Sequence, residues 1–331
     1  MSSSPLQADR VRELVTRFGS VSVLIVGDVM LDQFSIGRVS RMSPEAPVPV
    51  VEHDRDEYRI GGAGNVAYNV CTLGGRVELV GLVGSDGSAG ILRAELAASL
   101  IGCSGLVTDP TRRTTTKQRI VTTRHQQVAR IDYESDEEAS PTIERALIEQ
   151  IDRHLPHVQA VVISDYLKGT VTRLLASHVV EVSRTRGVPV LIDPKIPHID
   201  YYAGATLVTP NHHEAEVAAH LRIKTDDDAR RAGQVIIGRA RCESVLITRG
   251  EHGMSLIGPS TEAHFSAVAR EVADVTGAGD TVIATLSLSL AAGATLPEAA
   301  QLANHAAGIV VGRFGTAAVL PEELLANFGA H

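Results

Sequence analysis

The chain has 331 residues, of which 44% are hydrophobic and 21% are charged, and its formal net charge is −8. This composition is ordinary for a globular protein and excludes a largely disordered chain. The negative charge, the lack of Trp and the presence of only 6 Tyr and 5 Phe argue against a groove that binds nucleic acid through basic and stacking side chains.

The N-terminal part of the sequence predicts no membrane anchor. A charged stretch at 9–17 is typical of a helix, and the apolar run of a signal peptide or of a membrane span is missing. Three cysteines, Cys71, Cys103 and Cys242, lie far apart, so neither a disulfide framework nor a zinc site is indicated. We therefore expect a reducing, cytoplasmic environment and no membrane partner.

Strands and helices are predicted to alternate along most of the chain. Short apolar runs predict buried strands at 21–26, 78–83, 160–164, 188–192, 206–208 and 244–248. Helices are predicted at 64–73, 87–100, 141–154, 171–186 and 226–240. This alternation predicts an α/β fold, with a mostly parallel sheet covered by helices on both faces. Because nothing marks a domain boundary, we expect a single domain over 1–331.

Two stretches interrupt this alternation. The segment 34–53 holds three prolines in a strand-like context, and 114–133 alternates polar and apolar residues around a turn at 124–127. We interpret them as extended strands outside the main sheet that form a small antiparallel lid, with lid segments at about 34–60 and 112–134. Strands at 254–257 and 264–267 and helices at 279–292 and 296–313 are predicted to follow.

The strongest functional signal is Asp-Val-Thr-Gly-Ala-Gly-Asp-Thr at 274–281, directly before an apolar helix. The small residues Gly277, Ala278 and Gly279 leave backbone N–H groups unpaired at the helix start, where the helix dipole favours an anion. An acid there would repel a phosphate unless it accepts a proton from the attacking hydroxyl, and Asp280 fits that role. The alternative is a glycine-rich turn that Asp280 caps.

Two motifs resemble the signatures of the PfkB, or ribokinase-like, carbohydrate kinases. The segment 274–281 is similar to their C-terminal signature, and Gly-Gly-Ala-Gly-Asn-Val-Ala at 61–67 resembles their glycine-rich N-terminal signature. The order of elements between the two matches along nearly the whole chain. The resemblance implies an ATP-dependent sugar kinase with a ribokinase-like α/β fold, a β-strand lid over the sugar and Asp280 as the catalytic base.

Three further segments narrow the expected substrate. The segments 41–50, 114–117 and 193–195 resemble the heptose 7-phosphate kinases of lipopolysaccharide core synthesis. This resemblance implies phosphorylation of D-glycero-β-D-manno-heptose 7-phosphate at its anomeric hydroxyl. An acceptor with a phosphate needs cationic partners, and the stretch 112–130 has six basic residues and no acid. We expect Lys117, Arg119 and Arg130 of this stretch to bind the substrate. The alternative is a solvated basic strand.

Other side chains are assigned to the sugar by position and by resemblance. Asp28 and Asp32 follow the first strand at its carboxyl end, where open α/β sheets place ligands. A turn or capping role is the alternative for Asp28, and a structural salt bridge is the alternative for the pair Asp193 and Lys195. The resemblance completes the expected sugar site with Arg59, Gly61, Gly62, Asn65, Asp193 and Lys195.

The resemblance also implies ATP and Mg²⁺. Thr-Pro-Asn-His-His-Glu at 209–214 is similar to the Asn-x-x-Glu element of this superfamily. This similarity assigns Asn211 and Glu214 to the binding of ATP and Mg²⁺. The contact with Mg²⁺ is expected to be made through water, because Mg²⁺ retains part of its hydration shell. The loop at 248–254 resembles the adenine-side loop. The expected ATP contacts there and on the last long helix are Arg249, Gly250, Gly253, Asn304 and Gly308, for each of which a packing role is an equal alternative.

The sequence leaves three rival functions. The residues at 62–67 formally satisfy a dinucleotide-binding motif, but they follow the polar stretch 52–59 instead of a buried strand, which disfavours a dehydrogenase. A non-catalytic sugar or nucleotide sensor on the same fold could dispense with Asp280, which is present. A PfkB kinase of another sugar or sugar phosphate is the serious alternative.

Two expectations concern the whole chain. Relatives of these kinases carry a C-terminal nucleotidyltransferase domain, for which the length after 321–328 leaves no room, so the sequence predicts the kinase step alone. A lid of alternating strands exposes an apolar face unless something covers it, so we expect a homodimer that pairs two lids.

Overall fold

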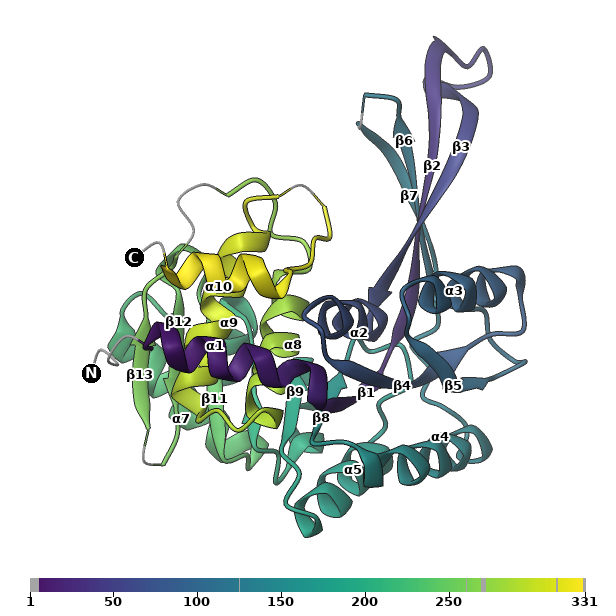
Figure 1. Cartoon of the computed structure of the whole chain (residues 1–331). Helices are drawn as coiled ribbons and strands as arrows, with labels where there is room; N and C mark the ends of the chain where they lie inside the picture. Colours follow the sequence, from purple (N-terminus) through teal and green to yellow (C-terminus); the bar gives the residue numbers. More distant parts are fainter. Residues whose placement is uncertain (1–5, 125, 260, 269–271, 314, 330–331) are drawn as a thin grey trace.

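Two β-sheets organise the computed structural model, which describes residues 6–124, 126–259, 261–268, 272–313 and 315–329. A nine-stranded sheet has the order β13-β12-β11-β10-β9-β8-β1-β4-β5, and a four-stranded sheet has the order β3-β2-β6-β7. Figure 1 shows the first sheet inside a body of helices, with the second sheet protruding from that body.

All neighbouring strands from β11 to β5 pair in parallel, and the pairs β11–β12 and β12–β13 are antiparallel, so β12 alone runs in the opposite direction. This confirms the predicted mostly parallel sheet. Its strands are β1 (Ser22–Gly27), β4 (Arg76–Val83), β5 (Gly102–Thr108), β8 (Ala160–Ser164), β9 (Val190–Asp193), β10 (Leu207–Val208), β11 (Ser244–Thr248), β12 (Met254–Ile257) and β13 (Glu262–Phe265). Because β4 and β8 lie on opposite sides of β1, the loops after β1 and β8 diverge at a point where open α/β sheets bind ligands.

Helices cover both faces of this sheet. One face carries α1 (Ala8–Arg17), α2 (Ala63–Thr72), α3 (Gly87–Ala98), α8 (Ala278–Ala291), α9 (Leu296–Val310) and α10 (Pro321–Gly329). The other face carries α4 (Pro141–His154), α5 (Arg173–Thr185), α6 (His212–Ala219) and α7 (Asp226–Ala240). Among the helices of the described segments, none has the length and apolarity needed to cross a membrane.

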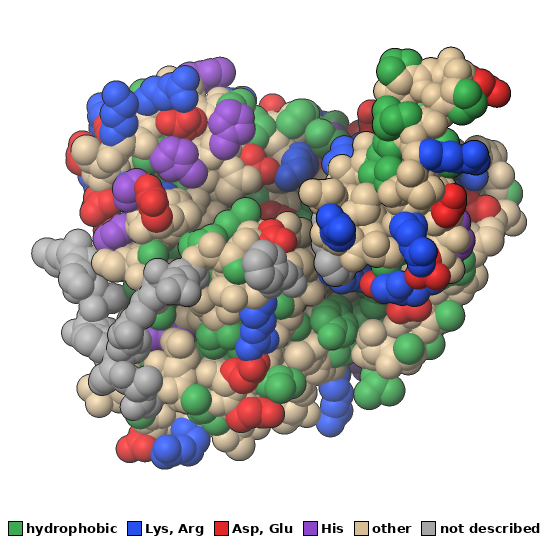
Figure 2. All heavy atoms as spheres, turned by 90° about the horizontal axis from the view of Figure 1, so that it is seen from above, with side chains coloured by type: hydrophobic (Ala, Val, Ile, Leu, Met, Phe, Trp, Pro, Cys, Tyr) green, Lys and Arg blue, Asp and Glu red, His purple; other side chains and the backbone are tan. Residues whose placement is uncertain are grey.

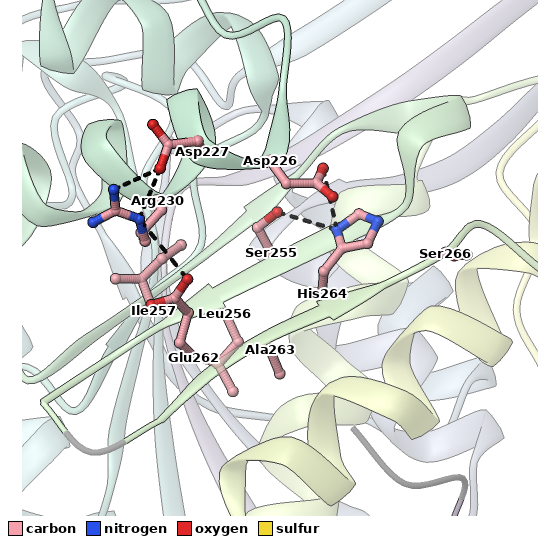
Figure 3. A pocket seen from close by; sticks show the side chains of 10 residues that line it. All are labelled: Asp226, Asp227, Arg230, Ser255, Leu256, Ile257, Glu262, Ala263, His264 and Ser266. Carbon is pink, nitrogen blue, oxygen red and sulfur yellow. Dashed lines mark hydrogen bonds and ion pairs between the residues drawn. The ribbon is translucent and has the colours of Figure 1, made fainter. Parts of the chain in front are cut away.

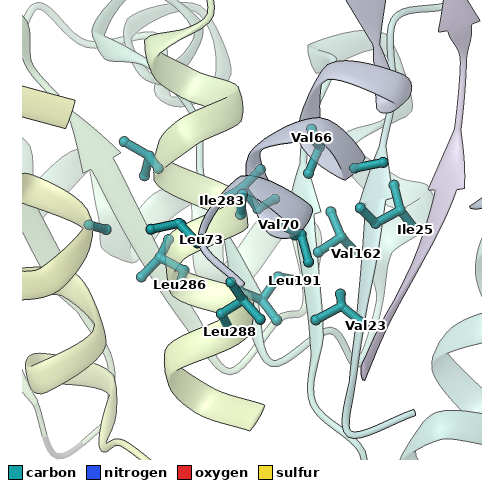
Figure 4. Packing of buried hydrophobic residues seen from close by; sticks show 14 of the residues in the cluster. Val23, Ile25, Val66, Val70, Leu73, Val162, Leu191, Ile283, Leu286 and Leu288 are labelled. Atoms are coloured by element: carbon teal, nitrogen blue, oxygen red, sulfur yellow. The ribbon is translucent and has the colours of Figure 1, made fainter. Parts of the chain in front are cut away.

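The core consists of two apolar layers, one on each face of the sheet. Successive side chains of a strand point to opposite faces, so Val23 and Ile25 of β1 enter one layer, and Leu24 and Val26 enter the other. In the first layer, helices α2 and α8 pack together on the sheet, as Figure 4 shows. This packing fixes the N-terminus of α8 against that of α2, which positions the site described below.

The lid sheet consists of β2 (Val29–Met42), β3 (Pro49–Gly62), β6 (Thr116–Thr122) and β7 (Gln127–Tyr133). The pairs β2–β3 and β6–β7 are antiparallel, but β2 and β6 are parallel. The predicted antiparallel lid is therefore a mixed sheet that begins at Val29. Arg112 does not belong to it, because its guanidinium pairs with Asp109 at 3.1 Å and donates to the carbonyls of Lys168 and Glu137 in the body.

Candidate active site

A cavity of about 150 Å³ lies between the N-terminus of α8 and the carboxyl ends of the central strands. Each central strand ends in a polar residue or leads into one, as parallel strands of a ligand-binding sheet commonly do. The lining residues are Tyr166, Asp193, Lys195, Thr209, Asn211, Glu214, Thr248, Gly277, Gly279, Asp280 and Val282. Residues that the sequence assigned to the base, the sugar and ATP therefore meet in one cavity.

Asp280 lies in the first turn of α8 and is buried. Its Oδ2 accepts a hydrogen bond from the Asn65 amide at 2.6 Å, and its Oδ1 accepts one from the Tyr166 hydroxyl at 2.9 Å. Burial raises the pKa of Asp280 to about 6, although these two donors and the ammonium of Lys195 act to lower it. The side chain is therefore mostly a carboxylate at pH 7 with a proton affinity suited to general base catalysis.

The turn before α8 contains the residues of the predicted anion hole. Gly277 caps the helix with φ 78°, a left-handed conformation that side-chain-bearing residues rarely adopt. The N–H of Ala278 donates to the carbonyl of Val275 at 3.2 Å, so it is not free for an anion in this conformation. The N–H groups of Gly279 and Asp280 belong to the first helical turn, where N–H groups have no intrahelical partner.

Carboxylates crowd the cavity around one lysine. The ammonium of Lys195 pairs with Glu214 at 2.7 Å and lies 5.2 Å from the centre of the Tyr166 ring. Burial, followed by the charge of Asp280, raises the pKa of Asp193 well above its usual range. Negative charge is thus in excess here, and a cation beside the carboxylates would be stabilised.

Acidic neighbours neutralise the basic residues of the lid. Arg119 pairs with Asp32, Lys117 pairs with Glu134 at 3.3 Å, and Arg130 pairs with Asp132 at 2.9 Å. The basic stretch contains no acid in sequence, but the neighbouring strands bring acids to it, so the free cationic surface expected from the sequence is mostly paired. Figure 2 shows Lys and Arg side chains close to acidic ones on the part of the surface that carries the lid.

Arg59 differs from Lys117, Arg119 and Arg130. It is exposed, its guanidinium stacks over the ring of Phe34 at 4.8 Å, and no acid pairs with it among the described residues. Strand register places it directly beside Asp32, which in turn lies beside Lys117. With Asn65, it lines a second cavity of about 290 Å³. Arg59 thus has no acidic partner among the described residues and shares a cavity with the donor to Asp280.

The carboxylate of Asp28 is hydrogen-bonded to backbone groups of the protein. Its carboxylate is buried and accepts hydrogen bonds from the backbone N–H groups of Tyr166, Lys168 and Thr170, at 2.8, 3.1 and 3.0 Å. These bonds match the turn role that the sequence left open, and sugar binding by Asp28 stays a prediction. The backbone carbonyl of Asp28 also explains Gly62, where a Cβ atom would lie 2.3 Å from that oxygen.

The pfkB family carbohydrate kinase model matches residues 21–323. The chain belongs to the pfkB family. It is therefore an ATP-dependent sugar kinase, which confirms the resemblance seen in the two signatures.

Several pfkB-family relatives share this sequence along most of its length. A protein named bifunctional protein HldE from Geobacter sulfurreducens is 42% identical over 325 residues, which are 98% of this chain and 66% of the relative. Another of that name from Pectobacterium atrosepticum is 46% identical over 308 residues, which are 93% of this chain and 63% of the relative. The chain thus spans somewhat less than two thirds of the length of these relatives.

Solved structures share the fold. Phosphofructokinase-2 from Escherichia coli in complex with potassium superposes with a TM-score of 0.76 at 18% identity, over 94% of this chain and 99% of that chain. Ribokinase from Arabidopsis thaliana, complexed with ribose and ATP, gives a TM-score of 0.69 at 17% identity, over 93% and 98% of the two chains. These likenesses confirm the ribokinase-like α/β fold.

The pfkB element at 209–214 forms a helix cap as well as part of the cavity. Asn211 Oδ1 accepts from the N–H of Glu214 at 2.9 Å, and Glu214 Oε2 accepts from the N–H of Asn211 at 2.9 Å. No group of three His, Cys, Asp or Glu ligands able to hold a metal occurs in the part of the chain that the structure describes. The role of Asn211 and Glu214 in holding a hydrated Mg²⁺ through water stays a prediction.

None of the residues predicted on the adenine side is among those that line the cavity at Asp280. The guanidinium of Arg249 is buried and donates to Asp226 at 2.5 Å and to Ser255 at 3.2 Å. The amide of Asn304 donates to the carbonyl of Ser266 at 2.7 Å. Gly250 and Gly253 lie in the turn between β11 and β12, and Gly308 lies in the last turns of α9. Their contacts with ATP stay predictions.

A larger cavity of about 500 Å³ lies beside α7 at the edge of the sheet, as Figure 3 shows. Asp226 contacts His264 there, at 3.7 Å, and Arg230 extends toward Glu262. It shares no lining residue with the cavity at Asp280. Size alone therefore does not identify the active site of this kinase.

Sequence reasoning missed Tyr166, which donates directly to the catalytic candidate Asp280. A usable signal was present, because Ser-Asp-Tyr at 164–166 stands at the carboxyl end of the predicted strand 160–164, where ligands bind in such sheets. The rule that ligands bind at the carboxyl ends of parallel strands indicates Asp28, which follows the first strand. The same rule indicates Tyr166, which follows the strand 160–164.

Proposed function

We propose that this chain transfers the γ-phosphoryl group of ATP to the anomeric hydroxyl of D-glycero-β-D-manno-heptose 7-phosphate, giving heptose 1,7-bisphosphate. In the cell this product would be used to build ADP-heptose for the lipopolysaccharide inner core. The observation that carries the catalytic part is the buried Asp280 carboxylate, held by Asn65 and Tyr166 beside the N-terminus of α8. The choice of heptose rests on the resemblance of 41–50, 114–117 and 193–195 and is supported by the relatives named HldE.

The proposed mechanism is direct in-line transfer. Asp280 takes the proton of the acceptor hydroxyl, and the first-turn N–H groups of α8 from Gly279 onward stabilise charge on the transferred phosphoryl group. Lys195 adds a positive charge in the same cavity. Mg²⁺, when bound to ATP, would neutralise phosphate charge, with Asn211 and Glu214 holding it through water. The lid keeps water from the acceptor side and so limits ATP hydrolysis.

The phosphate of the acceptor is proposed to bind at the lid beside Arg59. Among the described residues, no acid pairs with this guanidinium, so it can bind an anion without breaking an ion pair. It lines the same cavity as Asn65, which donates to Asp280. Lys117, Arg119 and Arg130 would have to exchange an acidic partner for the phosphate. Arg59 is therefore expected to contribute most to phosphate recognition.

Replacement of Arg59 tests this assignment. We expect Arg59→Met to raise the KM for heptose 7-phosphate about tenfold, because a charge-assisted hydrogen bond is lost, and to leave the KM for ATP nearly unchanged. Steady-state kinetics with an ADP-release assay measure both constants. The matched control is Arg55→Met, which removes an exposed arginine on the same strand that pairs with Asp54 and Glu57. Equal KM values for both variants and the wild type would contradict the phosphate site.

The ion pairs of the lid favour one alternative, a pfkB kinase of a neutral sugar. Acids already neutralise Lys117, Arg119 and Arg130, so an uncharged acceptor would require no exchange of their partners. Comparison of kcat/KM for heptose 7-phosphate, mannose 6-phosphate, fructose 6-phosphate, ribose and fructose distinguishes the two functions. A preference for ribose or fructose would be consistent with the kinase function but would contradict the proposed phosphate-binding site at the lid.

A homodimer that pairs two lids is proposed as the assembly. The lid exposes the apolar side chains Val39, Met42, Val48, Val128 and Ile131, and sheet edges with apolar side chains favour pairing with another chain. Light scattering at micromolar concentration is expected to give the mass of a dimer. A monomer mass at that concentration would contradict the proposal.

A further inference from the structure

The loop after β8 is held in a strained conformation by two buried carboxylates. Leu167 has φ 57°, in the left-handed region that residues with a side chain avoid. On one side, Asp28 accepts from three N–H groups of this loop, those of Tyr166, Lys168 and Thr170. On the other, Asp165 accepts from the N–H of Leu167 at 2.8 Å. Strain of this kind persists only where the surroundings over-determine it, which indicates that the loop's exact position matters.

Asp165 is itself held in place by His198 and Tyr202. Its carboxylate is fully buried, and its Oδ2 lies 2.7 Å from His198 Nδ1 and accepts from the Tyr202 hydroxyl at 2.8 Å. His198 stacks on the ring of Tyr201 at 4.2 Å. Hydrogen bonds to Asp165 and Asp28 thus hold the loop to the body of the protein.

The loop is also tied to the lid. Lys168 pairs with Glu134 at 3.1 Å and with Asp136 at 2.6 Å, directly after strand β7. Gly169 approaches the same segment so closely that a Cβ atom would lie 2.0 Å from the carbonyl oxygen of Glu137. One loop therefore connects the end of the lid to Tyr166.

We propose that Tyr166 is a positioning residue, whose hydroxyl holds Oδ1 of Asp280 so that the carboxylate faces the acceptor hydroxyl in one fixed orientation. The hydroxyl donates at 2.9 Å, while Asn65 holds the other oxygen at 2.6 Å. Two donors on different oxygens prevent rotation of the carboxylate about its Cβ–Cγ bond. The ring of Tyr166 also faces the ammonium of Lys195 at 5.2 Å, so one side chain orders both the base and the nearby cation. This inference rests on the proposed role of Asp280 as the base.

The charges around Asp280 determine what removal of the hydroxyl does. The groups that face it are Asn65 of α2, Tyr166, Asp32 of the lid, Asp193 at the end of β9, Lys195 two residues later, and Glu214 of α6. The carboxylate form gains a hydrogen bond from Tyr166, which lowers the pKa of Asp280. Loss of that donor therefore raises the pKa, and the acidic limb of the kcat profile moves to higher pH. A tyrosine that served only packing would not move this limb.

The test compares wild-type enzyme, Tyr166→Phe and Tyr201→Phe across pH 5 to 8, with saturating Mg-ATP and the best acceptor of the wild type. We expect wild-type kcat to fall below about pH 6, where Asp280 becomes protonated. Tyr166→Phe should lower kcat about tenfold, leave both KM values within about twofold and move the limb to higher pH. Tyr201→Phe loses a hydrogen bond to Glu138 at the surface and should behave as the wild type.

A second substitution covers the case in which Tyr166→Phe lowers the melting temperature. Replacement of Tyr166 by 3-fluorotyrosine keeps the ring and makes the hydroxyl a stronger donor, so the limb should move to lower pH. An unchanged limb and kcat in both Tyr166 variants, beside an inactive Asp280→Asn enzyme, would overturn the positioning role and leave the base intact. An active Asp280→Asn enzyme would instead overturn the proposed function from which the inference starts.

Discussion

Asp280→Asn is expected to lower kcat about 10³-fold, because the amide cannot accept the proton of the acceptor hydroxyl. The shape of the side chain is retained, and Asn65 can still donate to the remaining oxygen, so the melting temperature should change little. The measurement is ADP release at saturating ATP and acceptor at pH 7.5. KM values should stay close to those of the wild type, since the loss occurs in the transition state.

The control for this prediction is Asp227→Asn, which changes an exposed carboxylate in the first turn of α7. It should retain wild-type kcat, because Asp227 lies outside the cavity at Asp280. A general base typically contributes about 10²-fold or more to the rate. If the folded Asp280→Asn enzyme keeps more than about a tenth of wild-type kcat, Asp280 is not the general base.

Asp28→Ala is expected to destabilise the fold by about 3 kcal/mol, because one buried and two partly buried N–H groups lose their acceptor and each such loss costs about 1–3 kcal/mol. Urea unfolding followed by circular dichroism measures this change. The result separates the two roles that the sequence left open for Asp28. A folded variant with normal stability and a raised KM for the sugar would show that this carboxylate binds the substrate and is not needed to hold the loop.

Asp32→Ala provides the matched comparison. Asp32 was assigned to the same sugar site, but it is only partly buried and pairs with Arg119 on the lid. An ion pair near the surface stabilises a protein by about 1 kcal/mol or less, so the stability of this variant should be close to that of the wild type. Its effect should appear in the KM for the acceptor.

Most of the fold could be predicted because its signals are local. Strands 160–164, 244–248 and 254–257 and helices 141–154 and 226–240 lie where apolar runs and periodicity predicted them. The edge strand β5 was missed because its residues alternate irregularly between buried and exposed. The parallel pairing of β2 with β6 was missed because strand partners more than 80 residues apart leave no local trace.

In the candidate active site too, features that depend on neighbouring residues could be predicted, and features that depend on distant residues could not. Asp280 and its glycine turn are contiguous in the sequence, and the motif predicted their place together. The charge state of the lid depends on partners from other strands, such as Asp32 for Arg119, so composition over 112–130 could not predict it. The pairing of Tyr166 with Asp280 joins residues 114 positions apart. Only the position rule for strand ends could have indicated Tyr166.

The central claim is that this pfkB kinase phosphorylates the anomeric hydroxyl of a sugar that already carries a phosphate. The most direct test is to incubate the enzyme with Mg-ATP and D-glycero-β-D-manno-heptose 7-phosphate and to identify the product by ³¹P and ¹H NMR. We predict a second phosphorus signal coupled to the anomeric proton, as in heptose 1,7-bisphosphate. A product phosphorylated at another hydroxyl, or no product while a neutral sugar is turned over, would contradict the claim.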